Sequence, residues 1–388
     1  MAKKNVNKKI RIPFNKPAIM GRELFYISSA VSGGQISGDG KFSKRCHSFI
    51  EKRFGAKKAL LTTSCTSALE MAALLCGVSA GDEVIMPSFT FVSTANAFYA
   101  RGVKPVFVDI RPDTLNIDEK KIERAITRRT KAIVPVHYAG VGCEMDTIMA
   151  LAGKYKLYVV EDAAQAVDAK YKGRYLGTIG DLGAFSFHET KNCICGEGGA
   201  LLINKERFIE RAEIIREKGT NRAKFFRGEV DKYTWVDVGS SFLPSDILAA
   251  YLYAQFEKIN DIRLKRKRIF EYYYANLKAL QKEGLASLPF IPGYCRANYH
   301  MFYLILASGR QRDEVMRRLK DAGIYAIFHY VPLHTSKVGR SLGYKAGDFP
   351  VTEKISSRLL RLPFYNNLSR SQQGYIIDVL KSSVRAAM

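Results

Sequence analysis

Two charged side chains, Asp162 and Lys191, each follow a short apolar segment and together could support carbonyl chemistry. Asp162 ends the segment 158–162 (YVVED), and Lys191 comes shortly after the segment 183–188 (GAFSFH). Both segments have the composition of buried strands. Either charged residue alone would be ordinary, because strand-end aspartates often cap turns and most lysines are solvated. If the two strands are neighbours in an open α/β sheet, their carboxyl ends face one crevice, where such sheets bind ligands.

The chemistry that this pair offers is that of an amine beside a carboxylate. A lysine that has lost its proton can attack a carbonyl carbon and form a Schiff base. The pKa of an unperturbed lysine is about 10.4, so burial beside a cationic ring is needed to free the amine. Pyridoxal phosphate (PLP) requires such a lysine together with an acidic partner for its ring nitrogen. Lys191 and Asp162 supply both groups, and the stretch therefore predicts a PLP site.

A candidate phosphate site lies in residues 62–67 (TTSCTS), between a predicted strand and a helix rich in Ala, Leu and Met. Thr63 or Ser64 can cap this helix. Small hydroxyl residues at a helix start leave backbone N–H groups open toward an anion. The segment lacks the Gly-Lys pair of a Walker loop. By itself it would more often be a simple N-cap.

Strands and helices alternate along the chain to about residue 218, which predicts a mostly parallel α/β sheet covered by helices on both faces. Seven segments have strand character: 59–62, 83–87, 104–110, 131–138, 158–162, 183–188 and 199–204. Helices are expected at 22–31, 42–54, 117–126, 145–155 and 205–218. Two more are expected, one beginning near residue 64 and one that follows the strand 83–87 and ends near residue 102.

The rest of the chain predicts a smaller α+β domain. A long helical stretch at 244–280 could link the two domains, and we place the boundary near residue 255. The expected division is a large domain of residues 1–255, beginning with an extended arm over 1–20, and a small domain of residues 256–388. The elements expected in the small domain are strands at 299–306 and 325–330 and helices at 312–323, 352–361 and 370–385, the last with Ser369 and Gln372 as a capping box.

Composition is that of an ordinary globular protein, with 47% hydrophobic and 25% charged residues. No apolar segment follows the basic amino terminus, so we expect no signal peptide. Polar residues interrupt the most apolar region, 59–78, and a membrane span is not expected there. Seven cysteines are scattered, and Cys193-x-Cys195 lacks a second ligand pair for zinc. We expect reduced thiols, a cytoplasmic location and no metal.

The formal net charge of +24 favours an anionic partner, such as nucleic acid, an acidic membrane or a phosphorylated small molecule. The densest basic run, 263–268 (RLKRKR), lies in a helical pattern, where one solvated face would explain it. No zinc-finger spacing, RRM-type aromatic motif or Gly-rich basic tail is present. We therefore expect neither nucleic acid nor a membrane as the partner.

Three segments carry a resemblance to a known family: 161–166 (EDAAQA), 183–192 (GAFSFHETKN) and 196–199 (GEGG). In their order and spacing the chain resembles the PLP-dependent nucleotide-sugar aminotransferases of the DegT/DnrJ/EryC1/StrS family, over nearly its whole length. The resemblance implies an aspartate-aminotransferase-like fold (PLP fold type I) for the large domain. It also implies that Lys191 forms the internal aldimine with PLP and that Asp162 pairs with the pyridine nitrogen.

The resemblance implies further cofactor contacts. Cys65 and Thr66 would hold the phosphate, mainly through backbone N–H groups, together with the hydroxyl of Ser186. Phe91 would stack on the ring, and Gln165 would lie by the ring hydroxyl. Judged from the residues alone, Phe91 could belong to the core and Ser186 could simply satisfy a strand end.

One position departs from the family pattern. Many relatives carry an asparagine, within a GYNYR-like motif, that reaches the phosphate bound by the neighbouring subunit of a homodimer with shared active sites. The matching segment here is 236–246 (VDVGSSFLPSD), which places Ser241 at that position. A serine hydroxyl could still donate one hydrogen bond, although its reach is shorter.

The same segment and 328–334 (FHYVPLH) look most like the dTDP-4-amino-4,6-dideoxygalactose transaminase branch of the family. This likeness implies amino transfer from L-glutamate to the C4 keto carbon of dTDP-4-keto-6-deoxy-D-glucose, for surface polysaccharide or lipopolysaccharide O-antigen biosynthesis. Tyr330 and His334 would then approach the sugar. The sequence leaves open a UDP- or GDP-linked sugar and amination at C3.

Two other functions are compatible with the same fold. Family members that act as PLP-dependent sugar dehydratases replace the lysine with histidine; Lys191 is present here, although His188 lies three residues away. A regulatory, nucleic-acid-binding protein would bind DNA in a salt-dependent manner. The intact pair of Lys191 and Asp162 argues against that function.

Overall fold

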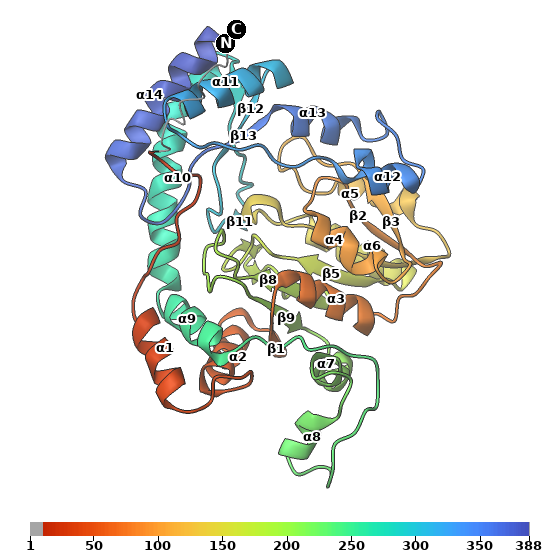
Figure 1. The fold of residues 1–388 in the computed structure, drawn as a ribbon. Helices are drawn as coiled ribbons and strands as arrows, with labels where there is room; N and C mark the ends of the chain where they lie inside the picture. Colours follow the sequence, from red (N-terminus) through yellow and green to blue (C-terminus); the bar gives the residue numbers. More distant parts are fainter. Residues whose placement is uncertain (1–10, 388) are drawn as a thin grey trace, which may run out of the picture.

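The computed structural model describes residues 11–387, and its centre is a seven-stranded sheet (Figure 1). Only β9 runs antiparallel to its neighbours, and the other strands point the same way. The seven predicted strands and the mostly parallel sheet are therefore confirmed. In spatial order the strands are β1 (Lys58–Thr62), β9 (Gly199–Ile203), β8 (Leu182–Ser186), β5 (Tyr158–Asp162), β4 (Thr130–Ile133), β2 (Glu83–Pro87) and β3 (Lys104–Val108).

Helices cover both faces of this sheet because its strands are apolar on both sides. In β1, for example, Ala59 and Leu61 join one buried cluster and Leu60 joins the other, as the alternation of a strand requires. The first cluster receives α1 (Glu23–Ser32), α2 (Lys41–Phe54), α6 (Met145–Tyr155) and α9 (Asp246–Glu257). Buried residues of α3 (Cys65–Leu75), α4 (Val92–Tyr99) and α7 (Ile209–Arg216) pack in the second cluster. The short α5 (Glu119–Ile122) precedes β4.

The carboxyl-terminal part has an apolar cluster of its own, around residues such as Phe302 and Leu304. Ser369 and Gln372 form the predicted capping box of the last helix. The domain boundary near residue 255 stays a prediction. Three strands of this part form a sheet in the order β10 (Ala286–Ser287), β12 (Tyr303–Leu306) and β13 (Leu359–Arg361). Its helices are α10 (Ile259–Lys282), α11 (Gly309–Asp321), α12 (Lys337–Ser341), α13 (Pro350–Arg358) and α14 (Arg370–Ala386).

Several predicted details of this part are wrong. The strand expected at 299–306 begins only at Tyr303, and Tyr299, where it was expected to start, adopts a left-handed backbone conformation with φ 54°. The segment 325–330 forms only a bridge between Ile327 and Arg361. Only His329 and Tyr330 of this segment contact the site described below, whereas Tyr325 and Phe328 are exposed (43% and 46%). The helix expected to run to 361 ends at 358, where β13 begins.

The predicted helical stretch at 244–280 is two helices, because Lys258 leaves the helical conformation between α9 and α10. The basic run 263–268 is not simply a solvated face. Arg266 is buried and donates hydrogen bonds to the carbonyl oxygens of Tyr299 (3.0 Å) and His300 (2.6 Å). Arg266, one of the basic residues of this run, therefore joins α10 to the segment before β12.

The predicted arm over 1–20 is only partly visible, since residues 1–10 lie outside the described part of the chain. From residue 11 the chain makes a bridge between Ile12 and Ile324. A third small sheet, ordered β11–β6–β7, connects distant segments: β11 (Cys295–Arg296), β6 (Lys170–Tyr171) and β7 (Arg174–Tyr175).

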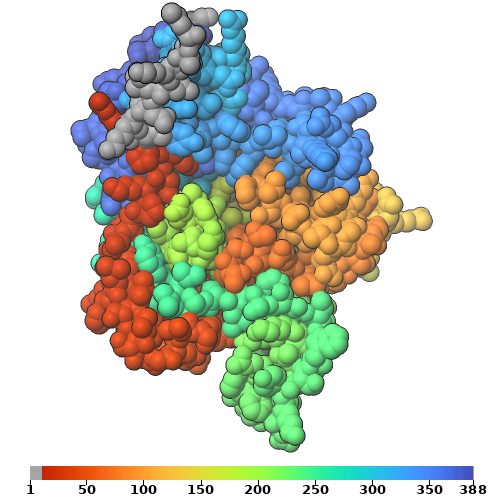
Figure 2. All heavy atoms as spheres, in the orientation of Figure 1, coloured from red at the N-terminus to blue at the C-terminus, as the bar shows by residue number. Residues whose placement is uncertain are grey.

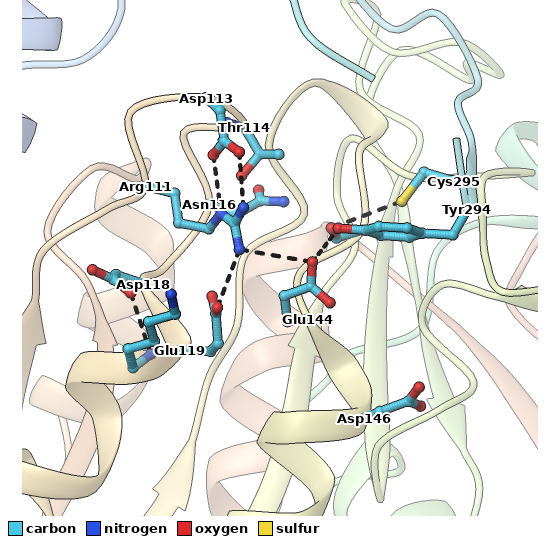
Figure 3. A network of polar contacts seen from close by, with 12 residues as sticks. Arg111, Asp113, Thr114, Asn116, Asp118, Glu119, Glu144, Asp146, Tyr294 and Cys295 are labelled. Carbon is cyan, nitrogen blue, oxygen red and sulfur yellow. Dashed lines mark hydrogen bonds and ion pairs between the residues drawn. The ribbon is translucent and has the colours of Figure 1, made fainter. Parts of the chain in front are cut away.

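A polar network beside this small sheet fixes the loop after β3 (Figure 3). Arg111 donates to Asp113 (2.8 Å) and Glu119 (3.1 Å) and forms a longer ion pair with Glu144 (3.8 Å). The hydroxyl of Tyr294 donates to the same Glu144. Arg111 holds the pKa of Asp113 below its usual range. The network thus joins the loop after β3 to the start of α6 and to the segment before β11.

The segment around α8 (Arg222–Phe226) projects from the body of the molecule, as the green atoms in Figure 2 show. Apolar side chains are exposed there, notably Phe226 (69%) and Trp235 (79%). Within residues 11–387, no helix combines the length and the apolar character needed to cross a membrane. Nor do three or more His, Cys, Asp or Glu side chains in that part of the chain gather as a metal site would require.

Candidate active site

A row of three residues crosses the carboxyl-terminal edge of the sheet beside the start of α3. Ser186 of β8 pairs with Gly199 of β9, and Gly199 pairs in turn with Thr62 of β1. Ser64 caps α3 by accepting a hydrogen bond from the backbone N–H of Ser67 (3.0 Å). The sheet therefore sets the hydroxyl of Ser186 and the first turn of α3 on either side of a glycine.

This first turn has the features of the predicted phosphate cradle. Within residues 11–387, no hydrogen bond satisfies the backbone N–H groups of Cys65 and Thr66. The hydroxyl of Thr66 is engaged with that of Ser93 (2.7 Å), so the backbone is what Thr66 offers to a ligand. The Ser186 hydroxyl accepts only a long bond from the N–H of His188 (3.5 Å) and keeps its own proton to donate. Free N–H groups at a helix start favour an anion.

Gly199 makes this arrangement possible by its lack of a side chain, and Gly199→Ala is expected to destabilise the protein. A Cβ there would lie 2.4 Å from the backbone nitrogen of Cys65 and 2.5 Å from the carbonyl oxygen of Ser64. Because backbone cannot move aside cheaply, we expect a loss of about 2 kcal/mol or more in the free energy of unfolding, measured by urea denaturation, together with weaker PLP binding. Gly153→Ala is the control: a Cβ on α6 meets nothing within 4 Å and should leave stability equal or raise it by about 0.5 kcal/mol. Equal effects of the two substitutions would contradict this role of Gly199.

Asp162 ends β5, next to β8 in the parallel part of the sheet. Its carboxylate accepts hydrogen bonds from the hydroxyl of Thr94 (2.7 Å) and from the N–H of Ala164 (3.1 Å). The hydroxyl of Thr90 must in turn donate to Thr94 (2.7 Å), since the Thr94 proton is committed to Asp162. The carboxylate is thus buried and held in one orientation.

Lys191 follows β8, and no hydrogen bond involves its amine within the described residues. Burial lowers the pKa of Lys191; Cys65 and Asp162 act to raise this pKa, and the charge of Arg361 lowers it further. The amine therefore interacts electrostatically with the acid of β5 and with the start of α3. Its neutral form is populated at lower pH than in a free lysine.

Two aromatic rings and an amide lie beside these groups. Gln165 accepts a hydrogen bond from the N–H of Ala139 (2.7 Å), so its amide nitrogen is the group that donates to the hydroxyl of Tyr330 (2.9 Å). Phe91, at the start of α4, is 57% exposed and lies 6.3 Å from the ring of Tyr330. Phe91 is therefore not a core residue, whereas Phe89 is (1% exposed).

His334 does not lie where a sugar could contact it, and the predicted contact is corrected here. Its side chain is fully buried, with Nδ1 bonded to the hydroxyl of Ser88 (2.7 Å) and Nε2 to Glu353 (3.0 Å). Neither a ring nitrogen nor exposed surface is left for a substrate. The residue fixes the loop after Tyr330 to the loop after β2.

Ser241 is exposed and bridges to Glu217. The next residue, Phe242, accepts a hydrogen bond from the N–H of Thr63 (2.9 Å), so the segment runs past the turn that leads into α3. The structure shows one chain, in which Ser241 lines a cavity with Asp39 and Arg216. The cross-subunit role of Ser241 stays a prediction.

Sequence reasoning missed the residues that support the predicted ones. Asn192, next to the lysine, donates to the carbonyl oxygen of Asn298 (2.8 Å) and accepts from Nδ1 of His300 (2.9 Å). Thr94 and Asn192 are small polar residues with no distinctive sequence signal. Arg361 does have one, because it interrupts an apolar run, LLRLPF (359–364).

The residues present fit PLP. The orphan N–H groups of Cys65 and Thr66 suit a phosphate, the oriented carboxylate of Asp162 suits a pyridinium nitrogen, and the free amine of Lys191 suits the aldehyde. The exposed ring of Phe91 can cover one face of a planar group. These groups therefore match the phosphate, the ring nitrogen and the aldehyde of PLP.

Comparison with known proteins gives the same result. The model of the DegT/DnrJ/EryC1/StrS aminotransferase family matches residues 17–381. The spore coat polysaccharide biosynthesis protein SpsC of Bacillus subtilis is 35% identical over 387 residues, covering 97% of this chain and 98% of SpsC.

Solved structures agree with this match. The aminotransferase TlmJ from Streptoalloteichus hindustanus has a TM-score of 0.89 and 28% identity, covering 97% of this chain and 100% of TlmJ. The PLP form of Spr1654 from Streptococcus pneumoniae has a TM-score of 0.90 and 25% identity, covering 97% of this chain and 99% of Spr1654. The predicted fold, PLP fold type I, is confirmed, and the solved forms support PLP as the cofactor.

Proposed function

The chain belongs to the DegT/DnrJ/EryC1/StrS aminotransferase family, and from this premise we propose that it aminates a nucleotide-linked keto sugar. The donor is L-glutamate, and the acceptor is the C4 keto carbon of dTDP-4-keto-6-deoxy-D-glucose. The product is a dTDP-4-amino-4,6-dideoxyhexose for surface polysaccharide or O-antigen biosynthesis. The observation that carries the amino transfer is the constellation of Lys191, Asp162 and Ser186 around the start of α3.

Each residue has a task in this reaction. PLP, when bound, supplies the electron sink that makes the α-proton of an amino acid acidic. Lys191 would hold the cofactor through Nζ, and the same amine, when neutral and free, would be placed to accept the proton from the donor carbon. Asp162 would pair with the ring nitrogen and favour its protonated form through the negative charge of its carboxylate, which Thr94 holds in one orientation. Ser186 and the first turn of α3 would hold the phosphate and so keep the cofactor in the site when it is not attached to Lys191.

We propose a homodimer with shared active sites. The projecting segment around α8 exposes large apolar side chains, including Phe226 and Trp235, which a second copy of the chain would cover. Ser241 lies exposed in the segment that follows, and in such a dimer its hydroxyl would donate to the phosphate bound by the neighbouring subunit. The surplus positive charge suits a substrate that carries a diphosphate. SpsC is named for polysaccharide biosynthesis, which supports a sugar as the acceptor.

The dehydratase is the weaker alternative because the lysine is retained. His188, the nearest histidine in sequence, bonds the hydroxyl of Thr190 (2.9 Å) and faces Glu197 (3.6 Å). The contacts of the His188 ring are thus with Thr190 and Glu197 and not with Lys191. Nothing in its geometry favours its acting as a second base.

A panel of keto sugars tests the proposed function. The protein with PLP and glutamate is supplied in turn with dTDP-, UDP- and GDP-linked keto sugars, and the products are identified by NMR. We expect ping-pong kinetics and a C4 amine, formed fastest from dTDP-4-keto-6-deoxy-D-glucose. A UDP or GDP sugar that is preferred, or a C3 amine, would correct the substrate. Salt-dependent retention on DNA, with no change in the PLP spectrum when glutamate is added, would overturn the enzymatic function.

A further inference from the structure

Asn298 is a buried asparagine that links loops at the carboxyl edge of the large sheet. It lies between β11 and β12, outside that sheet, and is 1% exposed. Its amide nitrogen donates hydrogen bonds to the carbonyl oxygens of Gln165 (2.8 Å) and Val167 (2.9 Å), in the loop after β5. Its backbone carbonyl oxygen accepts from the amide nitrogen of Asn192 (2.8 Å), in the loop after β8. Two loops of the site are therefore connected through one residue from another part of the chain.

The loop after β4 lies against the same side chain. A Cβ on Gly140 would lie 2.0 Å from the side-chain oxygen of Asn298, so only a glycine leaves room for this oxygen. The oxygen is buried and has no hydrogen-bond partner in residues 11–387. An unpaired buried oxygen is costly, and the two bonds of the amide nitrogen offset that cost. The loops that follow β4, β5 and β8 thus all meet at Asn298.

The residues after Asn298 hold it in place. Tyr299 has the left-handed φ of 54°, which is rare for a residue with a large side chain and persists where the surroundings enforce it. The carbonyl oxygens of Tyr299 and His300 both accept hydrogen bonds from the buried Arg266 of α10. Asn298 is therefore fixed from the carboxyl-terminal part of the chain.

Asn192 carries this connection to Lys191, the residue before it. Because the amide nitrogen of Asn192 donates to Asn298, its side-chain oxygen accepts, and Nδ1 of His300 carries the proton of their bond (2.9 Å). Both ends of the Asn192 amide are thus bonded, and the residue is buried. The backbone from which the Lys191 side chain begins is held by these bonds.

We propose that Asn298 is a positioning residue, which holds the loop carrying the Lys191 amine at a fixed distance from the loop that follows the Asp162 carboxylate; its effect on turnover rests on the proposed function. In that function the amine and the carboxylate must meet two different atoms of one planar cofactor. A displacement of about 1 Å between such groups can lower the rate roughly 100-fold. Three hydrogen bonds through one buried residue fix this spacing.

Loss of this connection should also change the ionisation of Lys191. Burial is the main cause that lowers its pKa, so a loosened loop that admits water should raise the pKa toward its ordinary value. The titratable and charged groups that interact with the amine are Cys65 of α3, Asp162 of β5, Arg361 of β13, and His300 and His329 of the carboxyl-terminal part. None of these groups is substituted in the variants below, so a shift reports how the amine is placed among them.

Asn298→Ala removes the two bonds to the loop after β5, and Asn204→Ala is the matched control. The amide nitrogen of Asn204 likewise donates to two backbone carbonyl oxygens, those of Gly177 (3.1 Å) and Gly180 (2.9 Å). Its side-chain oxygen is also buried and unpaired within residues 11–387. These contacts lie before β8, at the opposite edge of the sheet from Lys191. We expect both variants to lower the melting temperature by a similar amount.

The pKa of Lys191 separates the two variants. In protein freed of PLP, this pKa is the midpoint of the pH dependence with which trace acetic anhydride acetylates Lys191, measured by mass spectrometry of its peptide. We expect the midpoint to rise by about one pH unit in Asn298→Ala and to stay within about 0.2 unit in Asn204→Ala. With PLP bound, the limiting single-turnover rates with glutamate and with the keto sugar should each fall at least about tenfold in Asn298→Ala, while the half-saturating concentrations change less than about threefold.

Asn192→Ala breaks the connection from the side of the lysine and provides the test if Asn298→Ala does not fold. It should show the same shift and the same loss of rate, and the double variant should lose little more than either single variant, because the bonds form one connection. An unchanged midpoint in Asn298→Ala or Asn192→Ala, or an equal shift in Asn204→Ala, would overturn the role of Asn298. A wild-type protein whose PLP spectrum does not respond to any amino acid would instead overturn the proposed function, and the midpoints would still decide whether Asn298 positions Lys191.

Discussion

Lys191→Ala is expected to lower the rate of amino transfer by at least about 10⁴-fold, because one change removes both the covalent attachment of the cofactor and the base. In the wild-type protein the amine is free of hydrogen bonds within the described residues, and burial lowers its pKa. We expect purified wild-type protein to be yellow, and borohydride to fix the cofactor on the peptide that contains Lys191. Absorbance, mass spectrometry of that peptide and steady-state rates are the measurements.

Lys191→Arg is the control that keeps the positive charge while removing the nucleophile. It should be as inactive as Lys191→Ala, since a guanidinium is not deprotonated near neutral pH. Added methylamine should restore part of the activity of Lys191→Ala, which a merely unfolded protein would not show. A colourless Lys191→Ala protein that still turned over would refute the mechanism.

Much of the fold could be predicted because the sheet is buried on both faces. A parallel strand covered on both sides is a short apolar run, and the seven runs stood out between helical patterns. The small domain was harder to predict. The segment 325–330 (YAIFHY) is an apolar and aromatic run like that of a strand, yet His329 accepts a hydrogen bond from Arg361, and the hydroxyl of Tyr330 accepts one from Gln165. Such tertiary contacts leave no local signal.

The site was predictable where a residue follows a strand or starts a helix, as Asp162, Ser186 and Cys65 do. Their chain positions, together with the sheet order, bring them to one edge. His334 was placed wrongly because a histidine in a loop gives no sign of its burial. Arg361 interrupts an apolar run, LLRLPF (359–364), but only the three-dimensional structure shows that it is buried and that it lacks an acidic partner among the described residues.

Asp162→Asn is expected to lower the rate of amino transfer by about 10³-fold, since it removes the charge but keeps the shape of the side chain. The asparagine oxygen can still accept from the N–H of Ala164, and its amide nitrogen can donate to the hydroxyl oxygen of Thr94, so the position of the group should be preserved. What is lost is the negative charge that keeps the pyridine nitrogen protonated, and with it the electron sink. Stopped-flow absorbance of the reaction with glutamate measures the effect directly. Thr94→Val, which removes only the orienting hydroxyl, should cost roughly tenfold.

Asp181→Asn separates this effect from the general cost of losing a buried carboxylate. Asp181 is also buried, and it accepts a hydrogen bond from the N–H of Val159 (2.9 Å) near the opposite end of β5. Because it lies at the amino-terminal end of that strand, its loss should lower stability by about 1–3 kcal/mol and leave the PLP spectrum and the turnover of the folded protein intact. The two variants are therefore expected to have opposite phenotypes. Asp162→Asn should be folded and nearly inactive, whereas Asp181→Asn should be less stable and active. If Asp162→Asn kept its rate with glutamate, the carboxylate could not be the partner of the ring nitrogen, and the acid would have to be sought elsewhere in the site.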